Sequence, residues 1–115
     1  MRKKEFLEYK QSQYVLLIND NRVELPYPIR KCIEYNGGAI VLFYDDAVIS
    51  NNVEFYDKNG NKIWSINDLL KIKNPRGNVD IEMENDSVVC VTSSIGVVYR
   101  INITTNELIG KIMVK

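Results

Sequence analysis

The stretch IRKCIEYNGGAIVLFY, residues 29–44, decides the fold class of this chain. Its first seven residues alternate between two faces, as the side chains of a strand do. Asn36-Gly37 predicts a tight hairpin turn because both positions tolerate positive φ. Residues 39–44 are apolar on both faces, which is typical of an inner strand buried on each side. The alternation assigns the two faces of the first strand as Ile29, Lys31, Ile33 and Tyr35 against Arg30, Cys32 and Glu34.

The same pattern of strands occurs twice along the chain. Strands at 53–56 and 62–66, joined by a polar turn, complete a set of four that begins at residue 29. About 45 residues later, the period of a propeller blade, the set recurs at 79–84, 87–92, 97–103 and 108–114. The sequence therefore predicts two four-stranded antiparallel meanders.

Two short motifs carry a resemblance to a known family. The segment Tyr56-Asp57-x-x-Gly60-x-x-x-Trp64 resembles the blade signature of quinoprotein-type, WD40-like β-propeller repeats. Residues 99–107 are similar to it, but Asn106 stands where the family has Gly and Gly110 where it has Trp. The resemblance covers residues 29–114 and implies two blades. It does not imply quinone binding, which needs a closed ring of blades.

Two blades cannot close a ring, because propellers use about four to eight. Each sheet must still bury its apolar face, so we expect an all-β sandwich of two sheets packed face to face. The alternative is a homodimer that places four blades in a pseudo-ring.

One domain, 1–115, is expected to hold all of these elements. Its parts are a first sheet with an N-terminal hairpin at 12–66, a connector at 67–77 and a second sheet at 78–115. The hairpin at 14–25 is expected to extend the first sheet or cover an edge of it. A short helix is predicted at 2–11, and a helical turn capped by Asn67 at 68–72.

The composition argues against several classes of function. The 15 Lys and Arg residues equal the 15 Asp and Glu residues, whereas a nucleic-acid binder usually carries a basic excess. No run is long enough to span a bilayer, and no secretory signal is recognisable. We therefore expect a cytoplasmic protein, either a monomer or a dimer, with no membrane contact. The richness in Asn, Ile and Lys is typical of an AT-rich, bacterial genome.

The residue types also argue against enzyme chemistry. The chain contains no histidine, which removes the commonest general base and metal ligand. We expect no catalytic site, no metal and no cofactor. Cys32 and Cys90 are predicted to be buried free thiols, with a disulfide between them as the alternative. Glu82 and Glu84 share a strand face, which we interpret as solvated rather than as a glycosidase pair.

An acidic stripe is the candidate binding surface. It comprises Asp80, Glu82, Glu84 and Asp86, with Asp45, Asp46 and Glu54 expected on the equivalent edge of the first unit. Such a stripe either keeps a solvated face soluble or steers a charged partner. Our first hypothesis is a protein–protein interaction module, in particular an immunity-type inhibitor of a basic toxin.

Two other functions remain open. A cleft lined by aromatic side chains would bind a small, sugar-like ligand, and the candidates are Trp64, Tyr44, Tyr56 and Tyr99. The third hypothesis is a structural accessory domain of a larger assembly.

Overall fold

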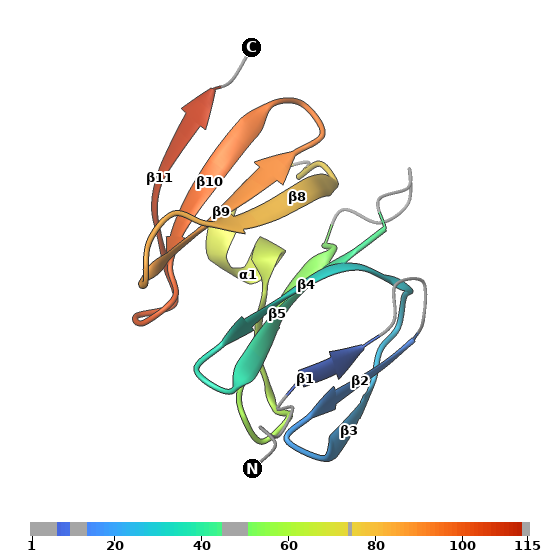
Figure 1. Ribbon diagram of the computed structural model, residues 1–115. Coiled ribbons are helices and arrows are strands. Elements are labelled where there is room, and N and C mark those ends of the chain that lie inside the picture. The colour runs from blue at the N-terminus through green and yellow to red at the C-terminus, as the bar shows by residue number, and fades with distance from the viewer. Residues whose placement is uncertain (1–6, 10–13, 45–50, 74, 114–115) are drawn as a thin grey trace.

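The computed structural model describes residues 7–9, 14–44, 51–73 and 75–113, in which the regular structure is mostly strands with one short helix (Figure 1). The strands form three antiparallel sheets, of order β1-β2-β3, β4-β5-β6-β7 and β11-β10-β9-β8. Their bounds are β1 Leu7–Tyr9, β2 Val15–Ile18, β3 Asn21–Glu24, β4 Ile29–Tyr35, β5 Gly38–Phe43, β6 Val53–Tyr56, β7 Lys62–Ser65, β8 Asn78–Met83, β9 Val88–Ser93, β10 Val97–Asn102 and β11 Glu107–Met113.

The two predicted meanders are confirmed and pack face to face as a sandwich. Each four-stranded sheet follows chain order, so each strand pairs with its neighbours in sequence. Apolar side chains from both sheets form one core cluster, to which the short helix α1 (Ile66–Leu70) adds Ile66 and Leu70. Figure 1 shows α1 between the two sheets.

Strand β5 is buried on both faces, as predicted, because the sheet to which it belongs is the middle layer. Ile40 and Leu42 point into the core shared with the second four-stranded sheet. Ala39, Val41 and Phe43 point the other way, into a second core closed by β2 and β3. Figure 1 shows the small β1–β3 sheet on the opposite side of β4 and β5 from β8–β11.

The N-terminal part of the fold differs from the prediction in two respects. Residues 7–9, within the predicted helix, are the strand β1, which pairs with β2 from Leu7 opposite Ile18 to Tyr9 opposite Leu16. Residues 2–6 and 10–11 of that prediction lie outside the described residues. The hairpin β2–β3 forms as predicted, but it joins β1 rather than the first sheet. Leu16 and Ile18 of this hairpin pack against the open face of the first four-stranded sheet. For residues 7–9, pairing with this buried hairpin outweighs a weak helix propensity.

A register shift in β4 corrects the predicted faces of that strand. The pairing with β5 shifts between Ile29 and Lys31, and a bulge of this kind turns one part of a strand to the other face. Ile29 therefore lies in the core that contains Val41, with Cys32 packed against it. Ile33 and Tyr35 pack against the other core.

The connector contains the predicted helical turn, but it begins earlier. Helix α1 is capped by Ser65 rather than Asn67, and the Ser65 N–H donates to the Asp68 carboxylate at 3.2 Å. The chain leaves the helix at Lys71, whose φ of 51° is left-handed. The N–H of Asn67 donates to the side chain of Asn51 at 2.8 Å. The earlier start places Ile66 on the buried side of the helix.

Candidate interaction site

The hairpin turns of the two four-stranded sheets meet at one end of the sandwich, here called the turn end. The turns are those between β4 and β5, β6 and β7, β8 and β9, and β10 and β11. Two contacts cross from sheet to sheet: the Tyr35 hydroxyl lies 3.4 Å from that of Thr104, and the Trp64 indole N–H donates to Asn106 at 2.9 Å. These contacts hold the turn end as one surface.

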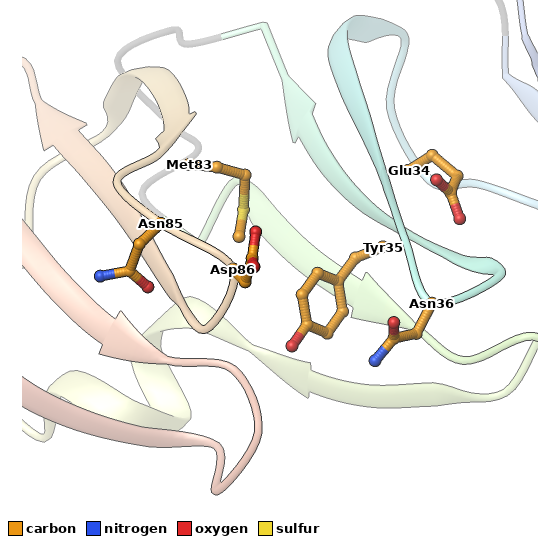
Figure 2. A pocket seen from close by; sticks show the side chains of 6 residues that line it. All are labelled: Glu34, Tyr35, Asn36, Met83, Asn85 and Asp86. Carbon is orange, nitrogen blue, oxygen red and sulfur yellow. The ribbon is translucent and has the colours of Figure 1, made fainter.

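Two adjoining hollows at the turn end share Tyr35 and Asn36, and together they form what we call the turn-end groove. The acidic half is lined by Glu34, Tyr35, Asn36, Met83, Asn85 and Asp86 (Figure 2). The apolar half is lined by Tyr35, Asn36, Phe55, Asp57, Lys58, Ile63, Ile103, Thr104 and Asn106.

The β4–β5 turn positions the central residues of the groove. Asn36 and Gly37 both have positive φ, 48° and 82°, as expected of an Asn-Gly turn. The Gly37 N–H donates to the Glu34 carboxylate at 2.8 Å, which closes the turn. The Tyr35 ring packs edge-on against Phe55, with ring centroids 6.1 Å apart. Figure 2 shows this ring between its own hairpin and the one that carries Met83 and Asp86.

The β8–β9 turn presents a free carboxylate to the groove. The Asn85 side chain accepts hydrogen bonds from the N–H groups of Ser87 and Val88, at 2.8 and 3.0 Å, and so fixes the turn. Asp86, at the tip, is exposed and has no hydrogen-bond or ion-pair partner among the described residues. A charged group held on a rigid turn is available to a ligand.

The predicted acidic stripe is partly neutralised within the fold. Asp80 pairs with Lys31 of the middle sheet at 2.9 Å. Glu84 accepts two hydrogen bonds from the Arg100 guanidinium, both at 2.8 Å, and these bonds lower the pKa of Glu84. Glu82 is exposed and, like Asp86, is unpaired in the described part of the chain. The four side chains thus divide into two internal ion pairs and two free carboxylates.

The structure does not place the acidic residues predicted for the first four-stranded sheet on an exposed edge beside the acidic stripe. Asp45 and Asp46 lie outside the described residues. Glu54 lies on the inner strand β6, and its side chain is only 8% exposed. Its carboxylate accepts a hydrogen bond from the Tyr56 hydroxyl at 2.6 Å and another from Ser65 at 3.3 Å. Burial, and then the Glu54 carboxylate, raise the pKa of Tyr56.

Both cysteines are free and partly buried, so the alternative of a disulfide between them is wrong. Burial raises the pKa of the Cys32 thiol to about 12. The pKa of Cys90 is raised as well, by burial and then by its contact with Glu84. Both groups are therefore protonated near neutral pH, and a protonated thiol is a poor nucleophile.

The described residues contain no group of His, Cys, Asp and Glu side chains that could hold a metal ion.

The aromatic side chains considered for a ligand cleft are placed differently from Tyr35. Trp64, Tyr56 and Tyr99 are at most 6% exposed and belong to the two cores, and Tyr44 is partly buried. Tyr35 and Asn36 are not among the site residues predicted from the sequence. The repeat did contain a signal for them, because matching turns of two stacked meanders must lie at the same end.

The family model for a domain of unknown function (DUF7957) matches residues 6–112. The chain belongs to the DUF7957 family. No curated protein and no solved structure matched the chain. Among the described residues, this DUF7957 domain has no helix that combines the length and apolar character needed to cross a membrane. The resemblance to quinoprotein-type blades is not tested by the family match and stays a prediction.

Proposed function

We propose that this DUF7957 domain is a non-catalytic module that binds a protein partner at the turn-end groove. The observation that supports the proposal is the juxtaposition of the Tyr35 ring, at the end of β4, with the free carboxylate of Asp86, on a turn of the other sheet. Aromatic side chains on a rigid support are typical anchors of protein interfaces. The buried cores stabilise the turns, so little order has to be gained on binding.

The charge of the groove favours a basic partner. The residues that line it include three acidic ones, Glu34, Asp57 and Asp86, and one basic one, Lys58. The Asp57 carboxylate accepts hydrogen bonds from backbone N–H groups of its own turn, at 2.9 and 3.0 Å. Carboxylates that steer a basic surface speed association and select partners. In its finer form, the proposal is an immunity-type inhibitor that meets a basic toxin in the bacterial cytoplasm.

An affinity pull-down with matched variants tests the proposed function. The tagged full chain, a Tyr35→Ala variant and a Tyr27→Ala control would be incubated with lysate of the native cell. Tyr27 is 38% exposed and packs against Phe43, away from the groove. We expect one stoichiometric protein to be retained by the wild type and the control and lost with Tyr35→Ala. A partner retained equally by all three, or no partner, would contradict the proposal.

A second candidate function is the binding of a small, sugar-like ligand. It is favoured by the presence of Asn36 and Asn85 with Tyr35 in the lining of one hollow, since small-ligand sites combine an apolar surface with a few placed polar groups. Trp64 fluorescence would report such binding, because its indole N–H bonds to Asn106 in the groove lining. Fluorescence that stays unchanged across a panel of mono- and disaccharides would count against this function.

A further inference from the structure

We infer that the turn-end groove takes an extended segment of its partner, with an arginine in the acidic half and an apolar side chain in the apolar half. The inference rests on the proposed function, because it specifies the chemistry of the segment that the groove would bind. It follows from the different linings of the two halves and from the turn they share.

The acidic half is suited to a planar cation. The residues that line it include two acidic ones, Glu34 and Asp86, and no basic one. The Glu34 carboxylate is bonded to the Gly37 N–H, so Asp86 supplies the free carboxylate. Figure 2 shows the Tyr35 ring on the side of its strand that faces Asp86, with Met83 beside Asp86, whereas the Glu34 side chain points to the other side of the strand. A guanidinium group stacks on an aromatic face and donates two parallel hydrogen bonds to one carboxylate. Arginine therefore fits this half better than lysine, whose ammonium is a strongly hydrated point charge.

The apolar half offers surface to an aliphatic side chain. Phe55, Ile63 and Ile103 contribute to its lining, and Ile63 is 42% exposed although its neighbour in the chain, Trp64, is buried. An aliphatic side chain placed here would shield the exposed part of Ile63 from water, and burial of apolar surface stabilises a complex.

One segment can fill both halves because they adjoin. Tyr35 and Asn36 line both hollows, so a chain that passes over the β4–β5 turn meets the acidic half on one side and the apolar half on the other. In an extended chain, alternate side chains lie on the same side, about 7 Å apart. The inferred segment thus carries its arginine and its aliphatic residue close together in sequence.

NMR titration of the ¹⁵N-labelled full chain tests this inference. The probes are acetylated and amidated peptides with an Arg and a Leu separated by one, two or three glycines. Each has a twin in which citrulline, the neutral isostere, replaces Arg. We expect saturable shifts of the side-chain amides of Asn36 and Asn85 and of the Trp64 indole with an arginine peptide. The citrulline twin should bind about tenfold more weakly, as expected from loss of a charge-assisted hydrogen bond.

Two variants with the same change in charge locate the contact. Asp86→Asn removes the free carboxylate in the groove, whereas Glu82→Gln removes the free carboxylate on β8 outside it. Both side chains are exposed, so both variants should fold. We expect Asp86→Asn to weaken binding of the arginine peptide about tenfold, and Glu82→Gln to weaken it less than about twofold, since distant surface charges are screened.

Three results would overturn the inference: equal binding of the arginine and citrulline peptides, equal effects of the two variants, or shifts confined to residues outside the groove. The pull-down distinguishes this failure from failure of the proposed function. A partner lost with Tyr35→Ala, without a response to the peptides, overturns the inference alone. Peptide binding at Asn36 and Asn85 without any protein partner supports the groove chemistry and contradicts the proposed function.

Discussion

At the scale of single residues, Asn52 is a fully buried polar side chain that joins the two four-stranded sheets. Its amide N–H₂ donates to the backbone oxygens of Phe43, at 3.0 Å, and Asn78, at 2.8 Å. Its oxygen accepts from the backbone N–H and the side chain of Asn78, both at 2.9 Å. One side chain thus satisfies buried backbone groups at the end of β5 and the start of β8.

We predict that Asn52→Ala lowers the free energy of unfolding by about 3 kcal/mol or more, because several buried polar groups lose their partner at once. The matched control is Asn51→Ala. Asn51 is exposed and accepts a single bond, from the Asn67 N–H, so its loss should cost about 1 kcal/mol. Urea unfolding of both variants measures the difference. Equal losses would show that Asn52 does not join the sheets as described.

Cys32 makes stability depend on pH in the alkaline range. Its folded pKa is about 12 because the thiol is buried, whereas an unfolded thiol titrates near pH 8.5. Between these values the unfolded state holds fewer protons than the folded state. Stability is therefore complete below the unfolded pKa and falls as the pH rises toward the folded pKa.

We predict that Cys32→Ala flattens the fall in stability between pH 9 and 11. The difference in slope from the wild type should approach about 1.4 kcal/mol per pH unit. Urea unfolding under reducing conditions at several pH values measures it. The internal control is pH 6 to 7, where the thiol is protonated in both states and the slopes should agree. Parallel curves from pH 9 to 11 would contradict the assignment.

At the scale of elements, the β1–β3 sheet acts as a cover for the middle sheet. The face of β5 and β6 that carries Val41, Phe43 and Tyr56 would meet water without it. The cover contributes Leu16 and Ile18 from β2, both fully buried. The outer face of the second four-stranded sheet differs, since its Glu84–Arg100 pair is partly exposed to solvent.

We predict that Leu16→Ala destabilises the protein by about 2–4 kcal/mol, the usual effect of truncating a buried leucine. Leu17, the next residue of β2, is only partly buried and points to the other side of the strand. Leu17→Ala should cost less than about 1 kcal/mol. Thermal or urea unfolding measures both variants, and similar values for the two would contradict the cover role of β2.

At the scale of the whole molecule, the middle sheet shares a core with each of its neighbours. Ile40 and Leu42 belong to one core and Val41 to the other, so a single strand connects all three layers. The stack extends to 46 Å along its longest axis and 23 Å along its shortest. Loss of either core exposes one face of β5, which couples the layers.

We predict that the described layers unfold in one transition. Trp64 fluorescence reports on the core between the two four-stranded sheets, where Trp64 is buried. Amide hydrogen exchange of β2 and β3 reports on the other core. Because both cores depend on β5, the two probes should give the same free energy of unfolding. Exchange of β2 and β3 with a markedly lower free energy would show that the cover opens independently.

Part of the candidate site can be predicted from the sequence. The acidic stripe indicates Asp86 as a binding residue, and the residue types Asn36-Gly37 predict the turn beside the groove. That Tyr35 and Asp86 line one groove could not be predicted, because they lie on separate sheets. Nor did the acidic pattern indicate that Lys31 and Arg100 would neutralise Asp80 and Glu84, since both cations come from other strands.

The sequence by itself determined the two meanders, the Asn-Gly turn and the buried strand β5, because alternation and turn chemistry act between neighbours in the chain. Only the tertiary structure decided that residues 7–9 form a strand, that Ile29 turns to the opposite core, and that Glu54 is buried. Each of these depends on a partner strand or layer that is distant in sequence. The free energy of those contacts exceeds the weak local preference of a few residues.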